Sequence, residues 1–107
     1  MHSRVTLLEI DTLRVDVEEA LARFRAEVLP QLREQPGYEG VLVLVSPEGP
    51  GLLVSLWSDE QAMEAAGPFA AGALARFATI FRAPPGREHY AVRLLDAPAG
   101  ALAALET

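Results

Sequence analysis

The sequence predicts an α+β fold of the ferredoxin-like type, with a four-stranded antiparallel sheet and two helices on one of its faces. Segments of strand-like composition and segments of helical periodicity follow one another in the order β-α-β-β-α-β. The length of 107 residues matches one domain, so we expect residues 1–107 to fold as a single unit. Half of the residues are hydrophobic, which is enough to build a buried core.

The first strand is expected at residues 5–10, where β-branched residues and leucines gather. Asp16 then resembles a helix N-cap, with Glu19 three residues later as in a capping box. Apolar residues recur after it at steps of three or four and give the helix one apolar face: Val17, Leu21, Phe24, Val28 and Leu32. Pro30 lies inside this pattern and should kink or end the helix, because a proline that stays helical costs about 3 kcal/mol.

Two further strands, residues 40–46 and 52–57, should form a hairpin around a turn at residues 47–51. Ser58 is the predicted N-cap of the second helix, and Gln61 completes a capping box with it. The turn residues and the cap together place the end of the hairpin directly before the second helix.

The second helix should be interrupted at Gly67 and Pro68. It is expected to resume with one apolar face formed by Ala70, Leu74, Phe77 and Phe81. A fourth strand is predicted at residues 87–95, and Pro98 can start a short C-terminal helix.

The hairpin strands are apolar on both faces, unlike the strands of a sheet with one wet face. Residues 41–45 are all apolar, and Ser55 is the only polar residue in the stretch 52–57. Both helices fit on one side of the sheet, so the other face needs a cover. A second copy of the chain is the simplest cover, and we predict a homodimer through this face. The alternative cover is the C-terminal tail, which is too short for four strands.

Composition argues against several classes of partner. Nine basic residues, all arginine, stand against 15 acidic ones and give a net charge of −6. This balance disfavours nucleic acids and anionic membranes, whose phosphates require clustered positive charge. Glu9 and Asp11 come too early for a signal peptide, and no apolar stretch reaches the length of a membrane helix. The absence of cysteine fits a reducing compartment, and a cytoplasmic location is expected.

Metal binding is not expected from the sequence. The chain has two histidines, no cysteine and carboxylates scattered along its helices, and these show no metal-ligand spacing.

Two stretches of the chain resemble one known family. Residues 35–40 (QPGYEG) precede the apolar hairpin, and residues 55–62 (SLWSDEQA) end it. This arrangement resembles the antibiotic biosynthesis monooxygenase family over residues 5–95. The resemblance implies a dimeric α+β barrel, in which two sheets face each other and each subunit holds a small cavity between sheet and helices. It also implies a phenol- or quinol-type aromatic ligand in that cavity and no cofactor.

The resemblance also shows where this chain departs from the family pattern. Trp57 matches the family tryptophan, but the asparagine that the oxygenases use four residues earlier is Leu53 here. Leucine has no side-chain hydrogen-bonding group. The tryptophan and histidine of the haem-degrading branch correspond to Ala66 and Arg76, so haem degradation is not expected.

Trp57 and His89 are the candidate catalytic residues. Trp57 could stack against a flat ring and offer its N–H to a substrate oxygen, or it could be a structural residue that packs beside the helix cap. His89 is the only histidine away from the terminus and could take a phenolic proton as a general base. Its position near the start of a strand also fits an exposed residue without a catalytic role.

Five further residues are candidate ligand-binding residues. Ser55 shares the face of Trp57 by strand alternation and could orient a ligand hydroxyl, or bond to backbone or water. Arg93 could bind an anionic group, although an ion pair with Glu9 is the favoured interpretation. Three larger side chains could line a pocket or fill the core: Tyr90, Met63 and Phe77.

The sequence leaves three functions open: a cofactor-independent oxygenase of aromatic compounds, a small-molecule-binding dimer without turnover, and a structural dimer with a filled core. A cavity that holds both Trp57 and His89 would favour the first. A cavity without a working base would favour the second, and the lack of any cavity beside Trp57 the third.

Overall fold

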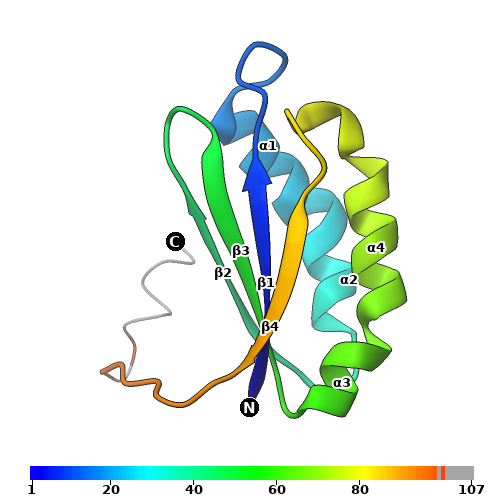
Figure 1. The fold of residues 1–107 in the computed structure, drawn as a ribbon, viewed down its shortest axis with the longest axis vertical. Helices are drawn as coiled ribbons and strands as arrows, with labels where there is room; N and C mark the ends of the chain where they lie inside the picture. The colour runs from blue at the N-terminus through cyan, green and yellow to red at the C-terminus, as the bar shows by residue number, and fades with distance from the viewer. Residues whose placement is uncertain (99, 101–107) are drawn as a thin grey trace.

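The computed structural model describes residues 1–98 and residue 100 (Figure 1). In chain order the elements are β1 (His2–Glu9), α1 (Val17–Arg23), a π-helical turn (Phe24–Val28), α2 (Leu29–Arg33), β2 (Tyr38–Val45), β3 (Pro50–Trp57), α3 (Glu60–Ala65), α4 (Gly67–Arg76), a 3-10 turn (Ala78–Ile80) and β4 (Gly86–Ala91). The C-terminal helix expected after Pro98 falls on residues 99 and 101–107, outside the described residues. No helix in the described part of the chain is long and apolar enough to cross a membrane.

The four strands form one sheet in the order β2-β3-β1-β4, and every neighbouring pair is antiparallel. The helices lie together on one face of this sheet (Figure 1). This arrangement confirms the predicted ferredoxin-like α+β fold.

The first helical segment begins as predicted, at Asp16. The Asp16 carboxylate accepts a hydrogen bond of 2.7 Å from the backbone N–H of Glu19, which satisfies a free donor at the helix start. The helix does not end at Pro30. A single π-helical turn, in which the N–H of Leu29 bonds to the carbonyl of Phe24, precedes the proline, and α2 continues with Pro30 in its first turn. The wider turn relieves the clash of a proline ring with the carbonyl four residues back.

The second helix begins one residue later than predicted, because Asp59 and not Ser58 is its N-cap. The Asp59 carboxylate accepts a hydrogen bond of 2.7 Å from the N–H of Ala62. The N–H of Ser58 instead donates to the carbonyl of Gly37 at 2.8 Å, so Ser58 still belongs to the hairpin end. The interruption before Pro68 is confirmed, since α3 and α4 are separate helices.

The last strand is shorter than the predicted 87–95. β4 ends at Ala91, which lies opposite His2, the first residue of β1. Beyond Ala91, no further residue of β1 remains for β4 to pair with. Only the N–H of Val92 still donates, to the carbonyl of Met1 at 3.0 Å. The length of the neighbouring strand therefore ends β4, although the alternating pattern continues.

Two buried clusters form where the sheet meets the helices. The first cluster is Leu32, Trp57, Met63 and Ala66. The second cluster is Ile10, Val15 and Ala20. Because β1 and β3 are antiparallel, with His2 opposite Trp57, the two clusters lie toward opposite ends of the sheet. The space between them holds the candidate site.

The sheet face away from the helices is apolar and exposed. Leu7, Leu42, Leu44 and Tyr90 are 46%, 40%, 48% and 52% exposed. Leu7 and Leu44 lie on the two sides of Leu52 in the register of the sheet, so they belong to one continuous surface. The prediction that the hairpin strands are apolar on both faces is confirmed.

Candidate functional site

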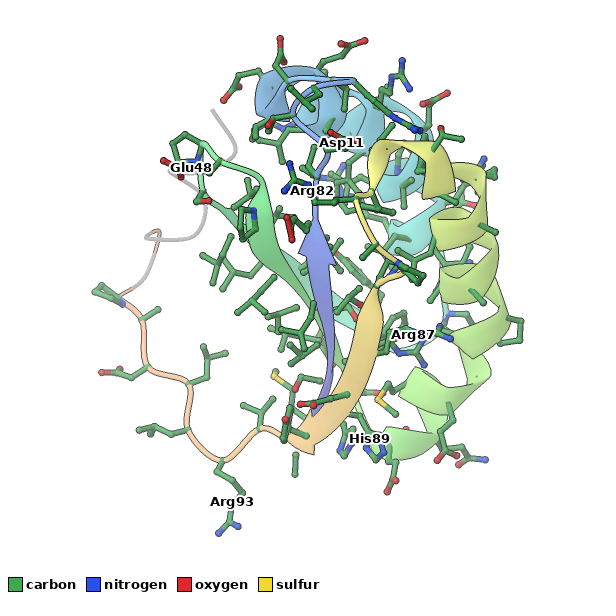
Figure 2. The ribbon with its side chains drawn as sticks, turned by 45° about the horizontal axis from the view of Figure 1, so that its top comes forward. Asp11, Glu48, Arg82, Arg87, His89 and Arg93 are labelled. Atoms are coloured by element: carbon green, nitrogen blue, oxygen red, sulfur yellow. The ribbon has the colours of Figure 1, made fainter. Side chains whose placement is uncertain are left out.

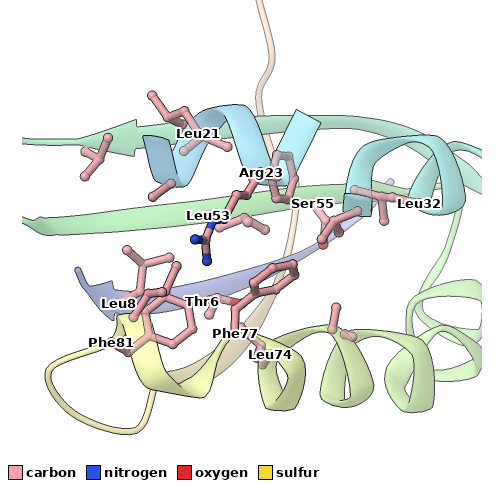
Figure 3. Close-up of a pocket in the computed structure, with 18 of the residues that line it drawn as sticks. Thr6, Leu8, Leu21, Arg23, Leu32, Leu53, Ser55, Leu74, Phe77 and Phe81 are labelled. Atoms are coloured by element: carbon pink, nitrogen blue, oxygen red, sulfur yellow. The ribbon is translucent and has the colours of Figure 1, made fainter. Parts of the chain in front are cut away.

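A cavity of about 120 Å³ lies between the sheet and the helices (Figure 3). Side chains of β1, β2 and β3 form one wall, and residues 20–32 and 69–81 form the others. The lining is almost entirely apolar and includes five aromatic side chains: Phe24, Trp57, Phe69, Phe77 and Phe81. One water molecule needs about 10–15 Å³ of such space, so the cavity has room for much more than isolated water.

Ser55 and Trp57 meet at one end of the cavity. Both are buried, at 4% and 2% exposure, and both belong to the lining. The indole N–H of Trp57 donates to the Ser55 hydroxyl at 2.9 Å. The Trp57 N–H is therefore occupied within the protein. Ser55 accepts this bond, and its own O–H remains able to donate toward a ligand.

Arg4 brings a positive charge to the same end of the cavity. It lies opposite Ser55 in the sheet, and its Nη2 donates to the carbonyl of Met63 at 2.8 Å. Burial lowers the pKa of the Arg4 guanidinium, and the charge of Arg87 lowers it further. No carboxylate of the described residues forms an ion pair with Arg4. Arg4 is thus a half-buried cation without a neutralising partner.

Two other polar side chains reach the lining. Thr6 is buried and lies opposite Leu53 in the register of β1 and β3. The head group of Arg23 extends from α1 toward the cavity (Figure 3), while its Nη2 lies 3.3 Å from a carboxylate oxygen of Glu19. The lining therefore carries two hydroxyls and two guanidinium groups in an apolar surface.

The structure brings only some of the predicted site residues together. Trp57, Ser55 and Phe77 line the cavity. Met63 is buried beside Trp57 in the first cluster and does not belong to the lining. Tyr90 lies on the opposite sheet face, where its hydroxyl donates to Glu88. That hydrogen bond raises the pKa of the Tyr90 hydroxyl.

Arg93 follows β4 and extends into solvent (Figure 2). The predicted ion pair between Arg93 and Glu9 is wrong, because Glu9 pairs instead with Arg82 at 3.5 Å. Because β4 ends at Ala91, Arg93 lies beyond the end of the sheet, away from Glu9, the partner expected for it.

His89 is exposed and does not line the cavity. It lies opposite Arg4 on β4, and its Nδ1 is 3.2 Å from Nε2 of His2. The lining contains no histidine, aspartate or glutamate among the described residues. The structure therefore separates the two candidate catalytic residues.

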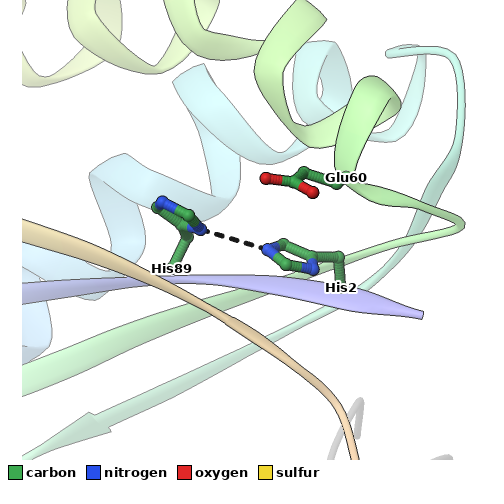
Figure 4. Close-up of side chains that lie close together, drawn as sticks. All are labelled: His2, Glu60 and His89. Atoms are coloured by element: carbon green, nitrogen blue, oxygen red, sulfur yellow. Dashed lines mark hydrogen bonds between the residues drawn. The ribbon is translucent and has the colours of Figure 1, made fainter.

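Three side chains that could serve as metal ligands lie close together, although the sequence shows no metal-ligand spacing. The side-chain ligand atoms of His2, Glu60 and His89 all lie within 4.8 Å of one another (Figure 4). Their spacing along the chain gives no signal, because the sheet register and the start of α3 bring them together.

Arg4 and Thr6 are the site residues that the sequence reasoning missed. The first strand was expected to start at Val5, whereas β1 starts at His2. The signal was present in the alternation: Arg4, Thr6 and Leu8 share one face of β1, and all three line the cavity.

One family model matches this sequence. It is described as antibiotic biosynthesis monooxygenase and covers residues 8–67, more than half of the chain. The chain belongs to the antibiotic biosynthesis monooxygenase family. The comparison with curated protein sequences gives no match.

Solved structures of similar fold include members of this antibiotic biosynthesis monooxygenase family. A protein of unknown function from Nitrosomonas europaea is 26% identical, with a TM-score of 0.71, over 92% of this chain and 95% of that one. A Streptomyces coelicolor monooxygenase from the gene ActVA-Orf6, in complex with Nanaomycin D, is 19% identical, with a TM-score of 0.68, over 92% of each chain. The haem degrader MhuD of Mycobacterium tuberculosis is 21% identical, with a TM-score of 0.68, over 91% of this chain and 100% of that one. The last two similarities, both below 25% identity, show the fold.

Proposed function

We propose that this protein binds a small aromatic compound of the phenol or quinol type in the cavity, and acts on it as a monooxygenase-like protein that requires no cofactor. The observation that carries the proposal is the apolar cavity beside Trp57, Ser55 and Arg4. Family membership supports the same class of ligand, because the solved Streptomyces monooxygenase is a complex with Nanaomycin D.

The lining favours a flat ring with one polar edge. Phe69, Phe77 and Phe81 offer aromatic surface, and such contacts add about 0.5–1.5 kcal/mol per pair beyond the burial of area. The polar groups gather at one end, where Ser55 can donate a hydrogen bond and Arg4 supplies a positive charge. A ring hydroxyl placed at this end satisfies both groups.

The charge of Arg4 favours the ionised form of such a ligand. An opposite charge within hydrogen-bonding range lowers the pKa of an acid by about 1–3 units. A bound phenol would therefore be present more often as the phenolate, the electron-rich form in which a ring most readily reduces oxygen. The protein would act by positioning and charge stabilisation, since the described lining has no carboxylate or imidazole base.

Haem is not the ligand that we propose. Haem iron is held by histidine, cysteine, methionine or tyrosine side chains. None of these residue types lines the cavity in the described part of the chain.

Binding without turnover is the second candidate function. Two observations favour it: the lining has no base, and Leu53 lies in the cavity wall where the family oxygenases have asparagine. Both functions require the same cavity, so a binding experiment comes first and an oxygen measurement separates them.

The test of binding uses Trp57 as the reporter, because it is the only tryptophan. Saturable quenching of its emission by hydroxyaromatic compounds is expected at micromolar concentrations. Ala73→Phe fills the cavity from α4 and should abolish the quenching, whereas Ala75→Phe places the same ring on the exposed side and should not. Equal quenching in both variants would show that the ligand binds elsewhere.

The test of turnover is oxygen uptake with the compounds that bind. Uptake that matches the loss of the aromatic compound supports the monooxygenase-like function. Binding with no uptake removes turnover from the proposal and leaves the binding function. Leu53→Asn is measured in parallel, and we expect it to raise uptake if the missing amide limits the reaction.

A further inference from the structure

We propose that His2, Glu60 and His89 form a binding site for a divalent transition metal ion, at the edge of the sheet and outside the cavity lining (Figure 4). The site supplies two imidazoles and one carboxylate. It is independent of the function proposed for the cavity, because none of the three residues belongs to the cavity lining.

The distances fit shared coordination. Nε2 of His2 and Nδ1 of His89 are 3.2 Å apart. Two nitrogen ligands bound at about 2.0–2.1 Å to one tetrahedral zinc ion lie roughly 3.3–3.4 Å apart. A carboxylate oxygen of Glu60 lies within 4.8 Å of one ring nitrogen of each histidine. Coordination of one ion requires the Glu60 side chain to move this oxygen closer to the two nitrogens.

The three ligands come from three fixed positions in the fold. His2 is on β1 and His89 on β4, and these strands are paired, with Arg4 opposite His89. Glu60 is the first residue of α3, whose start is fixed by the Asp59 cap. The bond from Arg4 to the carbonyl of Met63, one turn after Glu60, holds α3 against β1. The scaffold thus positions the ligands before any ion binds.

The Glu60 carboxylate brings a negative charge to the cluster, whereas Arg4, opposite His89 in the sheet, is positive. The hydrogen bond between the two rings requires one donor and one acceptor nitrogen, and the acceptor offers a lone pair that a cation could use. Glu60 has no ion pair or hydrogen bond among the described residues. A divalent ion would replace the shared proton between the rings and pair with the carboxylate.

The ligand set points to zinc, nickel, copper or iron. Imidazole suits these ions, whereas magnesium and calcium prefer oxygen ligands alone. Three protein ligands leave further coordination positions free for water or a small anion. The cluster is exposed, so such a ligand has direct access.

The test is titration of the untagged protein with Zn²⁺ by calorimetry, with Co²⁺ absorption as a report on the ligand field. We expect saturable binding of one ion per chain. His2→Ala, Glu60→Gln and His89→Ala should each weaken binding by at least about tenfold, since loss of outer-sphere partners alone has an effect of this size. Glu64→Gln, an exposed carboxylate one turn later on α3, should bind as the parent protein does.

Two outcomes would overturn the proposal. One is the absence of saturable Zn²⁺ binding by the parent protein. The other is binding that all four variants retain equally, which would place the ion on unrelated surface carboxylates. Circular dichroism of each variant separates the loss of a metal ligand from the loss of the fold. The side chains of Glu60 and His89 are exposed, so we expect these two variants to fold.

Discussion

At the scale of single residues, the bond between Ser55 and Trp57 organises the polar end of the cavity. Strand alternation is enough to predict that both side chains share one face, and that a buried serine needs a partner. That the partner is Trp57 itself depends on its rotamer, which packing against Leu32 and Met63 fixes. The hydrogen-bond partner of such a buried side chain depends on packing, and the sequence pattern does not predict it.

Ser55→Ala should destabilise the fold by about 1–3 kcal/mol, because it leaves the buried N–H of Trp57 without an acceptor. Urea denaturation of the parent, Ser55→Ala, Trp57→Phe and the double variant measures this. The penalty of Ser55→Ala should be much smaller in the Trp57→Phe background, which has no N–H to satisfy. An equal penalty in both backgrounds would mean that Ser55 contributes through packing alone.

The separation of His89 from the cavity has a different cause. The sequence identifies His89 as the one histidine away from the terminus, but its neighbour His2 lies 87 positions away in the sequence, on β1. Only the register of β1 and β4 shows that His89 meets His2 and Arg4 rather than Trp57. The register of two strands that are far apart in the sequence cannot be predicted from the spacing of residues within either strand.

At the scale of elements, the sequence predicted the order of strands and helices, and missed the ends that tertiary contacts set. The Asp16 cap was predictable because its hydrogen bond is local. The end of β4 was not, because it depends on where β1 begins. Pro30 is an intermediate case: its conflict with the helix was visible, but the π-helical turn that accommodates it was not.

The π-helical turn leads to a prediction for Pro30. A proline in a regular helix interior costs about 3 kcal/mol relative to alanine, so Pro30→Ala would normally stabilise by that amount. Here Pro30 occupies the first turn of α2 behind the π-helical turn, and we expect a change below about 1 kcal/mol. Pro68→Ala, in the same position of α4, is the matched control and should behave alike. A gain near 3 kcal/mol at Pro30 alone, measured by denaturant unfolding, would show that the turn leaves strain.

At the scale of the whole molecule, the open sheet face is the feature that needs a partner. It exposes Leu7, Leu42 and Leu44 in a protein of net charge −6. The sequence predicted this surface from the lack of polar and apolar alternation, because residues 41–45 leave no polar face. We propose that a second copy of the chain covers this face, in a homodimer whose two cavities would lie on the outer sides of the paired sheets.

Leu44→Glu tests this assembly directly. Leu44 is 48% exposed on the apolar face, in the edge strand β2, and a dimer with two-fold symmetry would bury both copies of the new carboxylate. Burying an unpaired charge costs several kcal/mol, so the variant should sediment as a monomer where the parent protein sediments as a dimer. Leu13→Glu introduces the same charge at a loop residue that is 89% exposed and should leave the dimer intact.

A parent protein that is monomeric at micromolar concentration, or a Leu44→Glu variant that is still a dimer, would contradict the proposed interface. Ligand quenching of Trp57 in the monomeric variant would then show whether the cavity depends on the second subunit.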